Sequence, residues 1–137
     1  MEMEKSQQEL MMNLSMFEQQ IQHLNQQLQA VEEGIVEMNS LSLALDELKD
    51  KKGEEILSPL GRGIFTRTKL ISENLIVDIG GKNFVEKSIP ETKKIIKNQI
   101  KKLEEVKKDL ESEVEKMNQE LREMFQKAQK ENSENKK

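Results

Sequence analysis

Apolar side chains recur every three or four positions over the first 50 residues. The gaps alternate between 4 and 3 through Leu10, Leu14, Phe17, Ile21, Leu24, Leu28, Val31, Ile35 and Met38. A sustained period of about 3.5 residues is typical of a coiled-coil seam. A 3-3 step then leads to Leu41, Leu45 and Leu48, which predicts a local change of helical winding. We predict a coiled-coil helix over residues 1–52.

The last 50 residues repeat this spacing. The second seam runs through Ile96, Ile100, Leu103, Lys107, Leu110, Val114, Met117, Leu121, Met124 and Ala128. Ser88 and Glu91 form the S-x-x-E pattern of a capping box, with Pro90 in the first turn, where proline costs no hydrogen bond. We predict a second coiled-coil helix over residues 89–130 and a disordered tail over residues 131–137.

Lys107 interrupts the second apolar seam at an a position. A polar side chain there can fix the register of the helices at some cost in stability. Alternatively, the lysine extends outward and Val106 shares the packing. The spacing alone favours neither interpretation.

Between the helices, residues 54–88 combine glycines with short β-branched runs. Four strands are predicted near residues 55–60, 64–71, 74–79 and 83–88, with tight turns at Gly61-Arg62-Gly63 and Gly80-Gly81-Lys82. These strands form two hairpins. Isolated hairpins are marginally stable and leave unpaired edges. We therefore expect several chains to assemble through this segment, using Ile56, Leu60, Ile64, Phe65, Leu75, Val77, Ile79, Phe84 and Val85.

The two helical segments have nearly equal length, so each can pair with the other inside one chain. The predicted fold is mainly α with a small β insert. It is a long antiparallel coiled-coil hairpin whose two helices are joined by two β-hairpins, in a single domain over residues 1–137. A parallel homodimer is the alternative, although the glycine-rich middle argues against a continuous rod.

An antiparallel turn near residue 70 brings the chain termini together at a distal tip. Residues facing each other across the seam then have numbers that sum to about 140. Seven of the eight methionines fall at this tip, several of them off the seam. Flexible methionine surfaces suit promiscuous recognition. The alternative is that methionine is simply tolerated in fraying helix ends. We expect contacts with other polypeptides at Met3, Leu10, Met11, Met12, Met16, Phe17, Met117, Leu121, Met124 and Phe125.

Composition supports an elongated helical protein. The 137 residues are 35% charged and only 3% aromatic, with no cysteine, so the chain depends on narrow apolar seams. Residues 1–48 hold nine acidic side chains and one lysine, whereas residues 89–137 hold thirteen basic and eleven acidic ones. This difference favours pairing of the two segments with each other.

Several function classes find little support in the sequence. Gly80-Gly81-Lys82 follows an apolar run, as in a phosphate-binding loop, but Asn83 replaces the required Ser or Thr and a strand is expected to follow. His23 stands alone, without a metal-ligand cluster. No basic patch with interleaved aromatics, membrane-length apolar run or catalytic constellation appears. We expect a cytoplasmic protein that is no enzyme, needs no cofactor, and binds neither nucleic acid nor membranes.

The order of elements closely resembles that of prefoldin alpha-type subunits. The resemblance covers nearly the whole chain and rests on ILSPLGRGIFTRTKL followed by LIVDIGGKNFVEKSIPETKKII. The single-hairpin beta-type subunit is the poorer match, because four strands are predicted here.

The resemblance implies a co-chaperone that works without ATP. Two alpha-type and four beta-type subunits would join their hairpins in a central double β-barrel. The distal ends of the six coiled coils would hold non-native client proteins and pass them to a group II chaperonin. The tip residues named above are then the predicted client contacts. A second possibility is a structural coiled-coil filament or scaffold subunit that assembles through the same hairpins and binds no clients.

Overall fold

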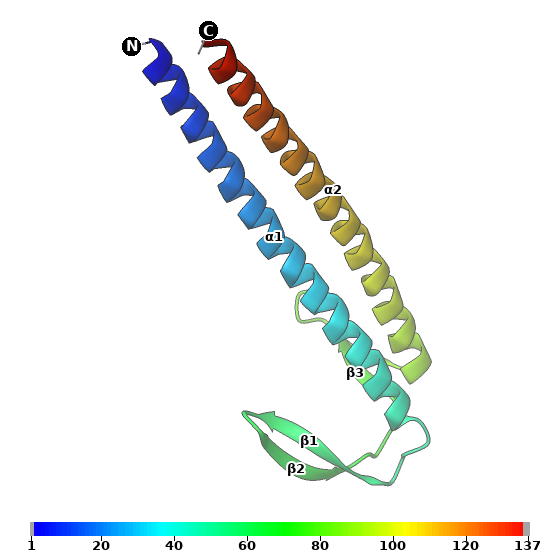
Figure 1. Ribbon diagram of the computed structural model, residues 1–137. Helices are drawn as coiled ribbons and strands as arrows, with labels where there is room; N and C mark the ends of the chain where they lie inside the picture. The colour runs from blue at the N-terminus through cyan, green and yellow to red at the C-terminus, as the bar shows by residue number, and fades with distance from the viewer. Residues whose placement is uncertain (1, 136–137) are drawn as a thin grey trace. The chain divides into compact units, whose positions relative to one another are not determined.

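The computed structural model shows two long helices joined by two β-hairpins (Figure 1). It describes residues 2–135, and the side chains of residues 5–131. The predicted fold class is confirmed. The elements, in chain order, are α1 (Glu2–Leu48), β1 (Glu55–Gly61), β2 (Ile64–Lys69), β3 (Leu75–Asp78), β4 (Phe84–Lys87) and α2 (Ile89–Asn135).

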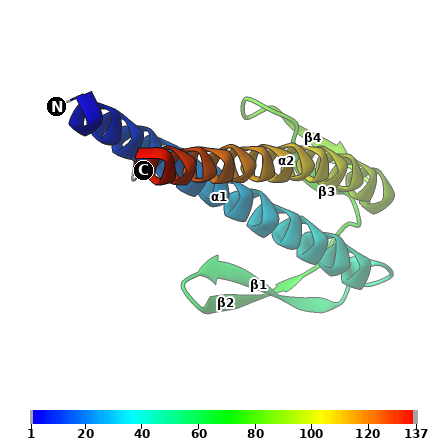
Figure 2. The ribbon, with the colours of Figure 1, turned by 45° about the horizontal axis from the view of Figure 1, so that its top comes forward.

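The chain divides into two compact units, and each contains parts of both helices. Unit 1 comprises Met1–Gly34 and Leu103–Lys137, and unit 2 comprises Ile35–Lys102. Within each unit the two helices lie side by side and run in opposite directions (Figure 1, Figure 2). In unit 1 the first turn of α1 and the last turn of α2 lie at the same end, which we call the terminal tip (Figure 1). That the whole chain forms one domain stays a prediction.

In unit 1 the helices pack along the predicted heptad seam. The seam side chains are half-buried, whereas most of their neighbours are exposed. Gly34 faces Leu103, and Glu32 faces Lys107. These pairs sum to 137 and 139, close to the predicted 140. Two helices alone cannot enclose a seam completely, so half-burial is the expected outcome.

Lys107 lies at the seam, half-buried, while the neighbouring Val106 is exposed. Its ammonium Nζ lies 3.9 Å from the Glu32 carboxylate on α1 and 3.9 Å from Glu111 one turn along α2. Val106 therefore does not share the packing, although the lysine does extend outward, so each interpretation is right in part. The side chain covers the seam with its methylenes and carries its charge out to two carboxylates.

In unit 2 the seam of α1 runs through Met38, Ser42, Leu45 and Leu48, so the regular 4-3 spacing holds as far as Leu45. Ser42 is half-buried at the a position, while Leu41 is exposed beside it. The predicted 3-3 step is therefore misplaced rather than absent: helix geometry puts residue 42 on the seam whatever its polarity, and the step falls from Ser42 through Leu45 to Leu48. The following Leu45 packs with Ile89 and Ile96 in the buried core of this unit.

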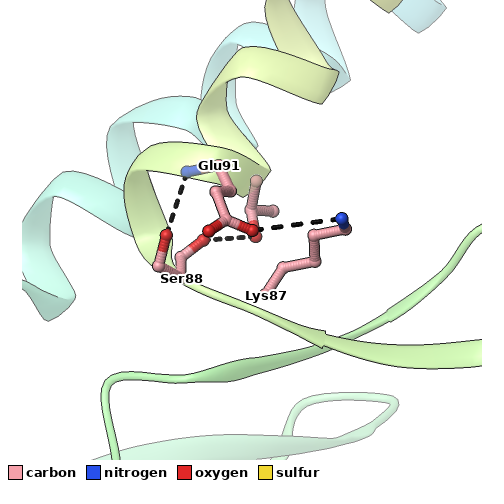
Figure 3. A network of polar contacts seen from close by, with 4 residues as sticks. Lys87, Ser88 and Glu91 are labelled. Atoms are coloured by element: carbon pink, nitrogen blue, oxygen red, sulfur yellow. Dashed lines mark hydrogen bonds and ion pairs between the residues drawn. The ribbon is translucent and has the colours of Figure 1, made fainter.

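Ser88 caps the N-terminus of α2, which is the serine half of the predicted capping box (Figure 3). The Glu91 backbone N–H donates to Ser88 Oγ at 3.2 Å, and the Thr92 hydroxyl donates to the Ser88 carbonyl at 2.8 Å. The Glu91 carboxylate also lies 3.9 Å from Lys87 Nζ, on the strand that enters the helix. Ser88 thus supplies two acceptors to the first turn, where backbone donors have no helical partner.

The helices end at different residues from those predicted. α1 ends at Leu48 rather than near residue 52. Asp50 has a positive φ of 61° that no α-helix continues, and its N–H donates to the Glu73 carboxylate at 2.8 Å. At the other end of the chain, α2 continues to Asn135. Residues 131–135, expected to be disordered, are therefore helical.

Each hairpin is a separate two-stranded antiparallel sheet. β1 pairs with β2 around an Arg62-Gly63 turn in which both residues have positive φ, the geometry of a type I′ turn. β3 pairs with β4 from Leu75 opposite Lys87 to Asp78 opposite Phe84. Two hairpins were predicted, and both are present.

The Gly80-Gly81-Lys82 segment forms the turn of the second hairpin. The Asn83 N–H donates to the Gly80 carbonyl at 3.1 Å, and the Gly80 N–H donates to the Asp78 carboxylate at 2.9 Å. Gly81 and Lys82 both have φ near 60°. A strand follows, where a phosphate-binding loop would need a helix, so these glycines serve the turn.

Candidate functional site

Exposed apolar side chains gather on two surfaces of the described chain. One lies at and near the terminal tip in unit 1, and the other covers the hairpins in unit 2. Large exposed apolar patches commonly mark interaction sites. Each surface contains residues singled out from the sequence.

At the terminal tip, the predicted residues divide between the seam and its flanks. Those on the seam are half-buried: Leu10, Phe17, Met117, Leu121 and Met124. Those off the seam are exposed, Met11 most of all at 71%: Met11, Met12, Met16 and Phe125. The side chain of Met3 lies outside the described residues. The apolar surface therefore consists of a continuous seam with methionines and a phenylalanine beside it.

One flank of unit 1 contains an open groove of about 680 Å³. Its floor consists of apolar side chains from both helices, and its walls are polar. The lining residues are Met16, Phe17, Gln19, Gln20, His23, Leu24, Glu113, Lys116, Met117 and Glu120. Three of the predicted client-contact residues meet in this groove: Met16, Phe17 and Met117. We call it the methionine groove.

The β3-β4 hairpin turns one face to the helices and the other to solvent. Leu75 packs against the core of unit 2. Val77 and Val85 pair with each other on the same face and are half-buried. These three predicted assembly residues are thus partly covered within their own chain. The predicted residues Ile79 and Phe84 are exposed.

The part of the β1-β2 hairpin near its turn is exposed on both faces. Leu60, Ile64 and Phe65 are all exposed, while Ile56 is half-buried. Within the hairpin, the Ser58 and Thr68 hydroxyls share a 2.7 Å hydrogen bond across the strands. Such a ribbon has few contacts of its own to bury apolar groups, which agrees with a role in assembly.

Sequence reasoning missed three exposed apolar residues in the hairpins and the connection between them. Ile76 is 74% exposed, Ile71 is 83% exposed, and Leu57 is also exposed. Ile76 lies on the opposite face from Leu75 and Val77, so strand alternation could have identified it. Ile71 lies in the connection between the hairpins, where no periodic signal exists.

A hollow of about 780 Å³ lies between the helices and the β3-β4 hairpin of unit 2. Leu41 and Ile95 line it from α1 and α2, and Ile76 and Ile79 line it from the hairpin side. This apolar hollow joins the exposed face of the hairpin to the root of the helices.

One ion pair ties the helices together in unit 2. Lys93 of α2 donates to the Asp46 carboxylate of α1. This hydrogen bond, assisted by the charges of Lys93 and Lys49, lowers the pKa of Asp46 below its usual range, although partial desolvation opposes the shift. The contact joins the last turns of α1 to the first turns of α2, at the end of the helices from which the hairpins extend.

The residues that could support other chemistry are dispersed. His23 is exposed and shares a 3.3 Å hydrogen bond with Gln27 on the same helix. Among the described residues, no group of three His, Cys, Asp or Glu side chains could hold a metal ion. Neither described helix is long and apolar enough to cross a membrane.

Comparison with known proteins identifies the fold and the family. A chain of the filamentous PFD from Methanocaldococcus jannaschii, determined by cryo-EM, superposes with a TM-score of 0.74. The match covers 82% of this chain and 94% of that one, at 21% identity. It shows that the fold is shared.

Curated relatives named prefoldin subunit alpha match at the level of sequence. The protein from Methanobrevibacter smithii is 31% identical over 97 residues, covering 70% of this chain and 66% of that protein. The one from Methanosphaera stadtmanae is 26% identical over 88 residues, covering 64% of each chain. The matched parts thus span slightly less than two thirds of these relatives. The family model described as Prefoldin subunit matches residues 17–134. The chain therefore belongs to the prefoldin family and resembles its alpha-type subunits.

Proposed function

We propose that this chain is a subunit of an ATP-independent holdase, a chaperone that binds non-native proteins and keeps them from aggregating. Family membership supports a chaperone-type role. The observation that carries the finer proposal is the exposed apolar surface of unit 1. Met11, Met12 and Met16 are exposed on the helix that also supplies the seam. A stable monomeric rod has no use for such side chains on its surface.

The hairpins supply the second half of the proposal. Their exposed residues, including Ile76, Phe84 and Phe65, lie on ribbons with unpaired edges. We propose that they pair with hairpins of beta-type subunits in a hexamer of two alpha-type and four beta-type chains. Clients would bind at the terminal tips, and a group II chaperonin would receive them. No step requires a nucleotide or a catalytic side chain.

Truncation separates the two roles. A chain lacking roughly the first 16 and last 20 residues keeps the hairpins and both proximal helix segments. It should still form a mixed six-subunit particle with a beta-type partner, as measured by native mass spectrometry. It should no longer suppress aggregation of a denatured client. If the truncated particle protects the client at the same molar ratio as the full chain, the holdase proposal is wrong.

A filament or scaffold subunit is the second candidate. The structural match to a filamentous PFD favours it, because that chain has the same fold. Native mass spectrometry of this chain alone distinguishes the two. Open-ended homopolymers would support a filament, whereas assembly only with the beta-type partner supports the holdase. The methionine-rich terminal tip argues for the holdase, since a spacer needs no exposed apolar end.

A further inference from the structure

The methionine groove has two chemically different walls. On the α1 side its polar residues are the amides Gln19 and Gln20, together with the imidazole of His23. On the α2 side they are Glu113, Lys116 and Glu120. An amide side chain can both donate and accept a hydrogen bond, which suits a polypeptide backbone, whereas a carboxylate accepts only. The groove thus combines an apolar floor, an amide wall and an acidic wall.

The two carboxylates of this wall have no partner within the chain. Among the described side chains, neither Glu113 nor Glu120 forms an ion pair or hydrogen bond. By contrast, Glu32 and Glu111 share Lys107. Helix α1 cannot supply a cation to the groove, because residues 6–48 contain no lysine or arginine. Lys116 lies in the same wall of α2, but among the described residues no ion pair joins it to either carboxylate, so both remain available to a ligand.

The other flank of unit 1 lacks this combination. Its depression is lined by amides, two seam residues and a single carboxylate: Glu18, Ile21, Gln22, Asn25, Gln26, Gln29, Asn118 and Leu121. It contains neither methionine nor phenylalanine. A neighbouring depression, which shares Asn118 with it, does place Leu28 and Val114 beside Glu111 and Glu115, but Arg122 also lines it and Lys107 contacts Glu111. Among these three depressions, methionine and phenylalanine lie beside carboxylates only in the methionine groove.

The net charge of unit 1 has the same sign as the groove. Residues 1–34 and 103–137 contain sixteen acidic and nine basic side chains, a net charge of −7, whereas residues 35–102 contain ten and thirteen, a net charge of +3. The negative charge of the chain is thus concentrated in the unit that carries the methionine groove. A field of this sign attracts cationic segments and repels anionic ones.

We propose that the methionine groove binds extended segments of non-native polypeptide in which large apolar side chains are flanked by lysine or arginine. This inference rests on the proposed holdase function and adds a preference among clients. The apolar side chain packs on Met16, Phe17 and Met117. The flanking cation pairs with Glu113 or Glu120, and the amides of α1 bond to the backbone of the segment.

The proposal can be tested with three labelled peptides that share one central Leu-Phe-Leu anchor. The anchor is flanked by lysines in the first, by glutamines in the second and by glutamates in the third. Fluorescence anisotropy with the full chain should show the lysine peptide binding about three- to tenfold tighter than the glutamine peptide, since exposed ion pairs contribute modestly. The glutamate peptide should bind most weakly. The differences should nearly vanish at about 1 M salt, where the Debye length falls to about 3 Å.

Paired variants assign the preference to the groove. The double change Glu113→Gln/Glu120→Gln should bring the lysine peptide to the affinity of the glutamine peptide and leave the latter unchanged. The control Glu105→Gln/Glu115→Gln removes the same charge from exposed positions of α2 that do not line the groove. The control variant should still bind the lysine peptide more tightly than the glutamine peptide, by most of the original factor. Circular dichroism checks that all variants remain helical.

Each contrary result has a distinct meaning. Equal binding of all three peptides at low salt would overturn the preference and leave the holdase proposal standing. An equal loss in the control variant would place the preference in the overall charge of the unit, which would overturn the assignment to the groove. If none of the peptides binds and the full chain also fails to suppress client aggregation, the holdase proposal fails together with the inference.

Discussion

Replacing Gly34 by alanine should stabilise the chain, because this glycine lies inside α1 with ordinary helical geometry. A Cβ built there meets Leu103 Cδ1 at 3.6 Å, a normal van der Waals contact that requires no displacement. Glycine within a helix costs about 0.5–1 kcal/mol relative to alanine, chiefly in backbone entropy. The expected gain is therefore about 1 kcal/mol, or roughly 3–6 °C in Tm for a chain of this size.

Gly63→Ala provides a matched control of opposite sign. Gly63 has a φ of 80°, and no atom lies within 4 Å of a Cβ built there. Any effect must then come from backbone strain, which costs about 1–2 kcal/mol for a non-glycine residue in the left-handed region. This variant should be destabilised by about 1 kcal/mol.

Urea unfolding followed by circular dichroism at 222 nm measures both changes. The protein concentration must be identical throughout, because stability depends on concentration when chains associate. A loss of 1 kcal/mol or more in Gly34→Ala would refute the reasoning. It would mean that α2 approaches α1 more closely at this position than the observed register allows, so that the added methyl group clashes.

Four further outcomes follow from individual contacts. Ser88→Ala should lower the unfolding free energy by about 1 kcal/mol, measured in urea, because the first turn of α2 loses its cap. Lys107→Leu should raise it by about 1 kcal/mol, since a half-buried seam position gains an apolar side chain and loses only an exposed ion pair. The lowered pKa of Asp46 means that its contact with Lys93 stabilises the fold above the ordinary carboxyl pKa and is lost as the pH falls through the lowered value. Asp46→Asn should therefore flatten the acid side of the stability profile, measured by urea midpoints at several pH values. Phe84→Ser should leave the helices intact by circular dichroism and weaken assembly with a beta-type partner in native mass spectrometry, because the proposed assembly buries the exposed Phe84 ring between chains.

The helical part of the fold was predictable because one physical constraint determines it. A repeat of about 3.5 residues specifies which side chains meet, and equal arm lengths specify the antiparallel pairing. The exception is the root of α1, where counting apolar residues selected Leu41. Helix geometry places Ser42 on the seam there and leaves Leu41 beside the hollow that faces β3.

The hairpins were predictable as elements, but their faces were not. Alternation separates Leu75 and Val77 from Ile76, and the sequence does not say which face meets the helices. Packing of Leu75 against Leu45, Ile89 and Ile96 decides this, and those contacts are not local in sequence. Exposure of Met11, Met12 and Met16 was predictable from their heptad positions, because off-seam residues of a two-helix coil have nothing to cover them.

Suppression of client aggregation by a variant of the tip is the most direct test of the holdase account. Changing Met11, Met12 and Met16 to serine removes three exposed apolar side chains from α1 at and near the terminal tip. Val36→Ser/Leu43→Ser is the control, because these residues are exposed to similar extents, 64% and 67%, on the same helix in unit 2. Each variant is assembled with the beta-type partner and added to a denatured client. Light scattering then measures how much each variant suppresses aggregation of that client. The triple variant should lose most of its protection while the control retains it. Equal protection by both variants would contradict client binding at the terminal tip.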